Sequence, residues 1–320
     1  MRIWLCLLML LAAACMAPRA QANPVCSFTI SDIHFGNIDL STNSEFTATG
    51  TLTATCFEEN TTQTITVCPS IGGGTGGAGS SGTERYMLNG ANQLIYNLYQ
   101  DAAMTQVWGS MYWAFPPQPP SWVFAKPGFT VVATRTIYAR IPAGQTALPT
   151  GTYSSSFSGI NARIEYKAGP ESCSTIHNSA DGTADVSFSV TATNAPSCSV
   201  SATALNFGSA GVLATNRDAT NTVNVTCNNG TPYTVALDGG QTGAADPTQR
   251  KMALGGNQVT YALYRDSARS LPWGSTSGID TLSATGTGSV QPHTVYGRVP
   301  PQTTPQPGTY TDTIVVTVTY

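Results

Sequence analysis

The chain contains two copies of one long unit. Six short blocks of the first copy recur in the same order in the second. The spacing is far too long for a solenoid repeat, so the chain is expected to fold as two domains of one kind. The matched blocks are Cys26-Ser27 and Cys198-Ser199, 51–56 and 222–227, 92–101 and 257–266, 108–110 and 273–275, 138–142 and 296–300, and 151–153 and 308–310.

The composition predicts β-structure. Thr, Ser, Gly and Asn dominate the polar positions after residue 22, and no segment there shows sustained 3.6-residue periodicity. Such a composition is typical of extracellular all-β proteins. The second copy has six strand candidates, whereas an immunoglobulin-like sandwich needs about seven strands. The candidates lie near residues 199–205, 222–226, 233–237, 259–264, 294–299 and 309–320.

The first copy contains a further strand signal that the second lacks. Val186, Phe188 and Val190 alternate with polar residues, which is the pattern of a half-buried strand. In the second copy the chain stops at Tyr320, shortly after Tyr310, without such a segment. The expected fold class is therefore all-β, with two tandem immunoglobulin-like sandwiches, the second of which lacks its final strand.

The expected organisation has three parts. Residues 1–22 have the features of a secretory signal peptide, with an early Arg, an apolar run and the cleavage pattern Ala20-Gln21-Ala22. The apolar run is short for a membrane anchor, and a lipoprotein site at Cys15 lacks the usual preceding Leu. Residues 23–194 are expected to form a self-closed sandwich and residues 195–320 an incomplete one.

Few charges remain in the secreted part of the chain. Charged residues make up 10% of the sequence. Removal of Arg2 and Arg19 with the signal peptide takes the net charge from −3 to about −5. Because binding to nucleic acid needs Lys and Arg to displace counterions, this charge argues against nucleic acid as a partner.

The cysteines indicate an oxidising compartment. Six remain after Cys6 and Cys15 are removed with the signal peptide, an even number. The repeat assigns one pair in each copy, and the last two pair by elimination. Each bridge is expected to stabilise the fold by about 2–4 kcal/mol. No C-x-x-C pair is present, so neither a metal nor another cofactor is expected. The expected disulfides are Cys26–Cys56, Cys68–Cys173 and Cys198–Cys227.

A sandwich without its last strand exposes strand edges and an opened core, and a strand inserted from another chain is the known remedy. The expected groove is lined by one face of the last strand candidate. The alternation there places five side chains on that face. These groove residues are Tyr310, Ile314, Val316, Val318 and Tyr320.

The repeated motifs resemble a known family. C-S…F-G, Y-x-L-Y-x-D, W-G-S and the final G-T-Y-T-D-T-I-V-V-T-V-T-Y resemble the spore coat protein U domains in subunits of archaic (Csu-type) chaperone–usher pili. The resemblance covers nearly the whole chain after residue 22. It implies three partners: a periplasmic chaperone that first fills the groove, an outer-membrane usher, and a neighbouring subunit whose N-terminal donor strand replaces the chaperone.

The expected cleavage leaves only Asn23-Pro24-Val25 before Cys26. Three residues are fewer than the five or six of a typical strand, so this chain is expected to accept a donor strand without giving one. With the resemblance, that implies a secreted adhesin at the pilus tip, with the first domain outermost, which mediates surface attachment and biofilm formation.

An aromatic, proline-rich segment distinguishes the first copy. Residues 111–124 contain several aromatic side chains, whereas the matching residues 276–291 contain none. In one interpretation these rigid aromatic side chains contact an abiotic or host surface. In the other they cap a local core. The candidate surface-binding residues are Trp113, Phe115, Trp122 and Phe124.

Other functions fit the sequence less well. A catalytic triad needs a nucleophile beside a His and a carboxylate, but His34, His177 and His293 are far apart and no G-x-S-x-G motif is present. The chain is therefore expected not to be an enzyme. A structural coat or pilus-shaft protein would need both a donor and an acceptor. A sugar-binding tip lectin would need more polar partners than the aromatic segment offers.

Overall fold

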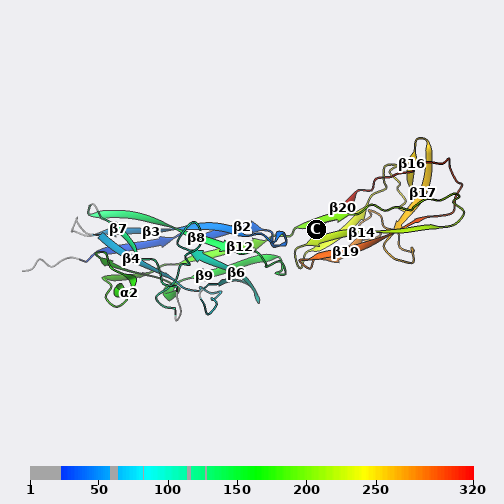
Figure 1. The fold of residues 1–320 in the computed structure, drawn as a ribbon. Coiled ribbons are helices and arrows are strands. Elements are labelled where there is room, and N and C mark those ends of the chain that lie inside the picture. The colour runs from blue at the N-terminus through cyan, green and yellow to red at the C-terminus, as the bar shows by residue number, and fades with distance from the viewer. Residues whose placement is uncertain (1–22, 58–63, 82, 114–116, 127) are drawn as a thin grey trace, which may run out of the picture.

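The computed structural model describes residues 23–57, 64–81, 83–113, 117–126 and 128–320. The expected signal peptide and Phe115 lie outside the described residues. Figure 1 shows an elongated molecule in which two β-rich domains lie end to end. We call residues 23–194 the first domain and residues 195–320 the second. The all-β fold class expected from the sequence is confirmed.

The first domain is a sandwich of two sheets. Its larger sheet has the strand order β1-β3-β8-β6-β5-β9-β12-β2, and its smaller sheet has the order β11-β10-β4-β7. Two 3-10 turns, η1 (Leu40–Thr42) and η2 (Gly159–Asn161), and one short helix, α2 (Cys173–Ile176), connect the strands. The strands are β1 (Val25–Ile30), β2 (Ile33–Ile38), β3 (Phe46–Phe57), β4 (Thr64–Ile71), β5 (Arg85–Asn89), β6 (Asn92–Tyr99), β7 (Trp122–Ala125), β8 (Thr130–Ile141), β9 (Gly151–Phe157), β10 (Ala162–Ala168), β11 (Gly182–Asp185) and β12 (Phe188–Asn194).

The second domain repeats this plan with fewer strands. One sheet has the order β13-β14-β19-β17-β16, and the other has the order β18-β15-β20. The strands are β13 (Cys198–Ala202), β14 (Arg217–Cys227), β15 (Pro232–Leu237), β16 (Arg250–Leu254), β17 (Asn257–Tyr264), β18 (Leu282–Thr285), β19 (Val290–Val299) and β20 (Val316–Thr319).

The strand prediction for the second domain differs from the structure at three strands. β16 and β18 were not predicted from the sequence, since they are only five and four residues long. The sequence also predicts one strand over residues 309–320, but the structure forms a strand only over Val316–Thr319. Residues 310–314 keep the predicted alternation of half-buried and exposed side chains. They form no continuous ladder because one of their edges has no neighbouring strand.

The two cores contain the same buried tryptophan and arginine. The indole N–H of Trp108 donates to the carbonyl oxygen of Pro69 over 2.7 Å, and that of Trp273 donates to Val235 over 2.9 Å. The tryptophan carbonyl oxygens accept from Arg85 and Arg250, over 2.6 and 2.7 Å. These contacts explain why the W-G-S block recurs, since it holds a core residue rather than a binding residue.

Three disulfides join the pairs that the sequence analysis expects. Cys26–Cys56 and Cys198–Cys227 connect the first long antiparallel pair of each domain, β1 with β3 and β13 with β14. Cys68–Cys173 joins β4 to α2. The third bridge has no counterpart in the second domain, because the described second domain contains no segment equivalent to α2.

Hydrogen bonds fix the junction between the domains. Asn194 and Asn228 are almost completely buried there, and the Asn228 amide donates to the side chain of Asn194 over 2.9 Å and to the carbonyl oxygen of Ala195 over 2.7 Å. The backbone N–H of Thr150 donates to the carbonyl oxygen of Asn229 over 3.1 Å. Hydrogen bonds between buried groups of both domains therefore connect them at this junction.

Candidate functional site

The first domain is closed by its own last strand. β12 lies between β9, to which it is antiparallel, and β2, to which it is parallel. Phe188, Val190 and Ala192 point inward and are buried. Phe188 stacks on Phe157 of β9, with the ring centroids 4.5 Å apart. This strand therefore completes both the hydrogen-bond ladder and the core.

The second domain has no counterpart of β11 and β12 among its described residues. The segments that match β9 and β2 are residues 308–314 and 205–210. The match of β9 is supported by two tyrosines, since the hydroxyls of Tyr153 and Tyr310 each donate over 2.8 Å to the carbonyl oxygen four residues earlier. No described strand lies between the two segments, where β12 lies in the first domain, and we call this position the groove.

Side chains along this groove are less buried than their counterparts. Tyr153 and Phe157 of β9 are fully buried, whereas Tyr310 and Ile314 are only half-buried. On the other side of the groove, in residues 205–210, Leu205 is half-buried although the matching Ile33 is fully buried. Apolar surface is thus left beside an incomplete ladder. The apolar side chains of these segments and of β20 that pack on the core while only partly buried are Leu205, Phe207, Tyr310, Ile314, Val316 and Val318.

The backbone along the groove is also open. Thr311 exchanges two backbone hydrogen bonds with Ala253 of β16, over 2.9 and 3.2 Å. The neighbouring Tyr310, Asp312 and Ile314 direct their N–H and C=O groups to the other side, where no backbone group of the described chain bonds to them. Unpaired strand edges of this kind accept an added strand.

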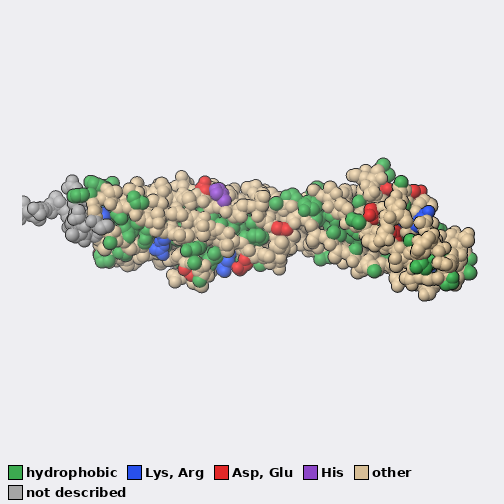
Figure 2. All heavy atoms as spheres, turned by 90° about the horizontal axis from the view of Figure 1, so that it is seen from above, with side chains coloured by type: hydrophobic (Ala, Val, Ile, Leu, Met, Phe, Trp, Pro, Cys, Tyr) green, Lys and Arg blue, Asp and Glu red, His purple; other side chains and the backbone are tan. Residues whose placement is uncertain are grey.

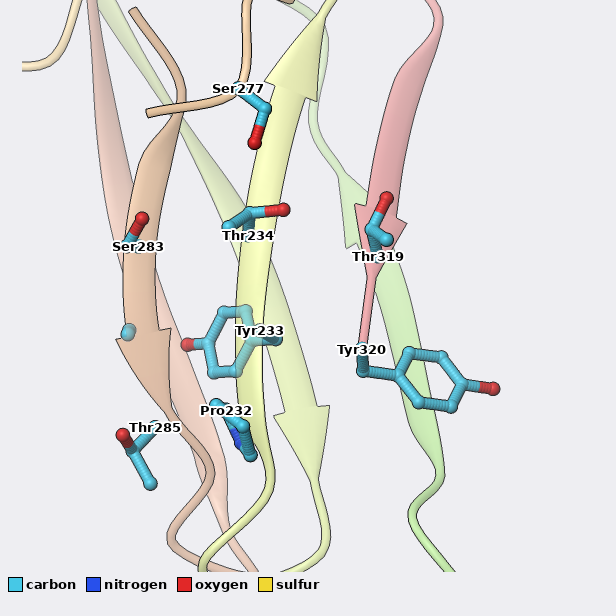
Figure 3. Close-up of a pocket in the computed structure, with 9 residues that line it drawn as sticks. Pro232, Tyr233, Thr234, Ser277, Ser283, Thr285, Thr319 and Tyr320 are labelled. Atoms are coloured by element: carbon cyan, nitrogen blue, oxygen red, sulfur yellow. The ribbon is translucent and has the colours of Figure 1, made fainter. Parts of the chain in front are cut away.

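Four of the predicted groove residues, Tyr310, Ile314, Val316 and Val318, lie against the core as partly buried side chains. Tyr320 differs because it is 59% exposed. Its ring points away from β15, beside an open hollow on this sheet (Figure 3). The matching Tyr166 is buried, and its hydroxyl accepts a hydrogen bond from the N–H of Cys26 over 3.3 Å.

Sequence reasoning missed three residues of the groove. Leu205 and Phe207 lie in residues 205–210, on the other side of the groove from Tyr310. The recurring F-G block was the sequence signal that could have identified Phe207. Asp312 lies in the middle of the alternating strip and faces the same way as Tyr310 and Ile314. Its acidic side chain hid it from a search for apolar residues.

Hydrogen bonds hold the carboxylate of Asp312 at the core. The hydroxyl of Tyr261 donates to Oδ2 over 2.7 Å, and the N–H of Gln241 donates to Oδ1 over 2.8 Å. Burial raises the pKa of Tyr261, and the bond to Asp312 raises that pKa further. The tyrosine therefore stays a neutral donor toward this carboxylate.

The aromatic segment of the first domain is more buried than its binding interpretation requires. Trp122 and Phe124 pack against the core and against each other, with ring centroids 5.0 Å apart. Trp113 is half-buried, and the guanidinium carbon of Arg85 lies 4.6 Å from the centroid of its ring. Phe115 lies outside the described residues, so the structure does not place the fourth candidate.

Other apolar side chains are exposed at this end of the domain. β7 and the start of the described chain lie at the end farthest from the second domain (Figure 1). Val25 is paired with Phe57, and Val132 with Thr55, so Val25, Phe57 and Val132 share the outer face of one sheet. All three are more than half exposed. Phe129, which precedes β8, is 60% exposed.

We call Val25, Phe57, Phe129 and Val132 the distal apolar face. Figure 2 shows hydrophobic side chains at this end of the molecule. Isolated exposed apolar residues are common, whereas a group of them at one end of a molecule is a candidate interaction site.

The hollow beside Tyr320 is lined by Tyr, Ser, Thr, Pro and Ala side chains, without a carboxylate, His or Cys. In the described part of the chain, no group of three or more His, Cys, Asp or Glu side chains could hold a metal ion. Nor does the described chain include a helix with the length and apolar character needed to span a membrane.

Comparison with known proteins defines the class to which this fold belongs. The family described as Spore Coat Protein U domain matches residues 12–158 and 184–317. The chain therefore belongs to the Spore Coat Protein U domain family, with two copies of the domain in tandem.

Similar proteins include a curated relative and two tip adhesins. Protein U of Myxococcus xanthus is 38% identical over 81 residues, which are 25% of this chain and 45% of Protein U. The chain thus spans less than half the length of that relative.

A chain in the CsuC–CsuE chaperone–tip adhesion subunit complex from archaic chaperone–usher Csu pili of Acinetobacter baumannii has a similar fold. Its TM-score is 0.54 and its identity 16%, over 92% of this chain and all of that chain. The CupB6 tip adhesin of Pseudomonas aeruginosa has a TM-score of 0.41 and 11% identity, over 93% of this chain and 95% of that chain.

Proposed function

We propose that the protein is a tip adhesin of a secreted chaperone–usher pilus, which mediates surface attachment and biofilm formation. The observation that carries this proposal is the open groove of the second domain beside the filled groove of the first. A domain that closes itself can stand at the end of a fibre, whereas a domain with an unpaired edge needs a strand from another chain.

The groove defines the proposed partners. A periplasmic chaperone first covers it, an outer-membrane usher receives the subunit, and the N-terminal donor strand of a neighbouring subunit finally occupies it. The route leads through the periplasm to the cell surface, as the expected signal peptide at residues 1–22 requires. A chain of the CsuC–CsuE chaperone–tip adhesion subunit complex of Csu pili has a similar fold over most of this chain, which supports this assignment.

The groove is tested with the full mature chain, with and without an added strand. A copy of residues 182–194, the sequence of β11 and β12, is fused after Tyr320 through a short Gly-Ser linker. The fused chain is expected to be a soluble monomer, and the unmodified chain to aggregate unless a chaperone is co-expressed. An unmodified chain that is soluble, monomeric and as stable as the fused one would contradict the proposal.

The proposed adhesive surface is the distal apolar face. It lies at the end of the first domain farthest from the second, so it stays free when the groove is filled. Contact with an abiotic or host surface would then bury Phe57 and Phe129, which are already exposed. Aromatic side chains give much contact area for little lost conformational entropy.

Attachment of piliated cells to hydrophobic plastic tests this surface. Changing Phe57 and Phe129 to Ser is expected to lower attachment severalfold, while the first domain unfolds at its usual temperature, since exposed positions contribute within about 0.5 kcal/mol. The matched control changes Ile279 and Val290, exposed apolar residues of the second domain, and is expected to leave attachment unchanged.

Two of the surface-binding residues predicted from the sequence, Trp122 and Phe124, can be compared with Phe57 and Phe129. Trp122→Ser and Phe124→Ser are expected to lower the stability of the first domain as well as attachment, because both side chains pack on the core. Normal attachment by the Phe57 and Phe129 variant, with normal pili, would remove the distal apolar face from the proposal.

A further inference from the structure

Matched positions in the two grooves carry different side chains. Ser155 of β9 and Asp312 both point inward, one residue after the position that bonds to β5 or β16. In the first domain Ser155 is paired with Val190 of β12, and both are fully buried. Side chains paired across antiparallel strands share one face and touch. The strand that fills the second groove therefore places one side chain directly against Asp312.

The carboxylate of Asp312 has one acceptor site left for that side chain. An ionised carboxylate offers about four lone-pair sites. Oδ1 accepts from the N–H groups of Gln241 and Thr313, both over 2.8 Å, and Oδ2 accepts from Tyr261 over 2.7 Å. The described residues supply no further donor to Oδ2, so one of its acceptor sites is left without a hydrogen bond.

The neighbouring loop holds the carboxylate in place. Gly240 has a φ of +72°, and a Cβ at this position would overlap Oδ2 of Asp312. A hydrogen bond from the Gln241 side-chain amide to Thr313 Oγ1, over 3.4 Å, adds a second contact between this loop and the segment that contains Asp312. Asp312 therefore cannot turn away when a strand covers it.

An apolar strand residue would be a poor cover for this position. It would remove water from the free site on Oδ2 without replacing the lost hydrogen bond. A short hydroxyl side chain removes the same water and donates in its place. In the first domain the arrangement is reversed, because the hydroxyl belongs to Ser155 and the strand supplies Val190.

We propose that the strand accepted by the second domain carries Thr or Ser at the position that faces Asp312. The inference rests on the proposed function, since it assumes that a strand of a neighbouring subunit fills the groove antiparallel to residues 308–314. The pairing of β12 with β9 gives the flanking positions. A bulky apolar residue faces Ile314, as Phe188 faces Phe157, and a small residue faces Tyr310, as Ala192 faces Tyr153.

The donor pattern read toward the C-terminus is thus bulky apolar, any residue, Thr or Ser, any residue, and small. Asp312 acts as a specificity residue, because it favours strands with this hydroxyl over strands with an apolar residue in the same register.

The test uses the full mature chain with the copy of residues 182–194 fused after Tyr320. In the copy, the residue that matches Val190 is either Val or Thr, which have nearly the same shape. Each version is made with Asp312 and with Asp312→Ser. Guanidinium unfolding of the second domain is measured, with the first-domain transition of the same molecule as the internal reference.

With Asp312, the Thr strand is expected to raise the folding equilibrium constant of the second domain by about tenfold over the Val strand, the effect of one charge-assisted hydrogen bond. With Asp312→Ser, the preference is expected to disappear or reverse. As a second measurement, the linker is cleaved and the rate of exchange with free labelled peptide is recorded. The Thr strand is expected to leave about tenfold more slowly.

The outcomes separate this inference from the proposed function. If the Val strand equals or exceeds the Thr strand with Asp312 present, the hydroxyl inference fails while the groove remains an acceptor. If neither strand produces a folded second domain, the proposed function fails and takes the inference with it. If Asp312→Ser leaves the tenfold preference intact, the hydroxyl acts elsewhere and the role of Asp312 is rejected.

Discussion

Residues 153–157 of the first domain and 310–314 of the second carry the same alternation of inward and outward side chains, yet the two segments differ in structure. The first is part of β9, paired on both edges, and its inward side chains are buried. The second is paired on one edge, at Thr311, and its inward side chains stay half-exposed. The difference teaches that the closing strand, more than the local sequence, decides whether this segment becomes a core strand.

The rest of the core does not need that strand. Trp108 and Trp273 are fully buried in their domains, and Arg85 and Arg250 donate to matching carbonyl oxygens. These residues are therefore buried in both domains, whether or not a closing strand is present. The four predictions below test how far the two domains are equivalent.

The largest effect is expected from opening the first domain. Val190→Asp places a charge at a fully buried position on the inner face of β12, which is expected to cost at least about 5 kcal/mol. Denaturant unfolding of the full chain should then show loss of the first-domain transition. Thr193→Ala, on the outer face of the same strand, is the control and should change little. A normal transition in the Val190→Asp chain would show that β12 does not close the core.

The second largest difference in stability between the two domains is expected from substitution of the buried arginines. Arg85 is fully buried and donates to Gly72, Ile71, Trp108 and Asn97, and burial lowers its pKa to about 10. Arg85→Met leaves these acceptors without a donor and is expected to destabilise the first domain by about 3–5 kcal/mol.

Arg250 is as fully buried as Arg85. Arg250→Met is nevertheless expected to cost the second domain less, because the open groove lets water reach the carbonyl oxygens that lose their donor. Thermal melting of both variants measures the two losses. Equal losses would indicate that the open groove does not reach the arginine.

Shortening an apolar side chain beside the groove is expected to lower stability by a smaller amount, which depends on whether the groove is filled. Phe157→Ala is expected to cost the first domain about 3–5 kcal/mol. Ile314→Ala, at the matching half-buried position, is expected to cost about 1 kcal/mol in the chain without an added strand, in proportion to its partial burial. With the strand fused after Tyr320, the cost should rise to about 2–4 kcal/mol. A cost that the fused strand does not change would argue that Ile314 lies outside the groove.

The smallest effect concerns pH. His293 lies 2.8 Å from the hydroxyl of Tyr233, and burial lowers its pKa below 6.5. The unfolded chain therefore takes up the proton first as the pH falls. This group contributes stability above pH 6.5, and the contribution is lost as the pH falls to the folded pKa. Unfolding midpoints at pH 7.5 and 5 should show a small loss in the second domain that His293→Gln removes.

Sequence patterns predicted much of the fold because the two copies support one another. The recurring blocks indicated two domains, and the alternation around Phe188 indicated a strand where the structure forms β12. They did not indicate β16 and β18, which are too short to give a clear signal and become strands through pairing with β17 and β15. Short strands of this kind depend on their neighbours more than on intrinsic preference.

The groove was only partly visible in the sequence. The inward side chains Tyr310, Ile314, Val316 and Val318 followed from a period of two residues. Leu205 and Phe207, on the other side of the groove, could not be predicted in this way. They lie about 100 residues away along the chain and pack on the same core as Tyr310 only in the folded domain.

The sequence by itself determined the repeat, the all-β class and which faces of the longer strands are apolar, because these depend on residue type and local period. Tertiary structure alone decided that Trp122 and Phe124 pack on the core while Phe57 and Phe129 face solvent. It also decided that Asp312 is held by Tyr261 and Gln241 in an otherwise apolar groove. The burial of a side chain and its hydrogen-bond partners depend on which distant segments of the chain pair. The unpaired strand edge and the hydrogen-bonded carboxylate of Asp312 therefore exist only in the folded domain.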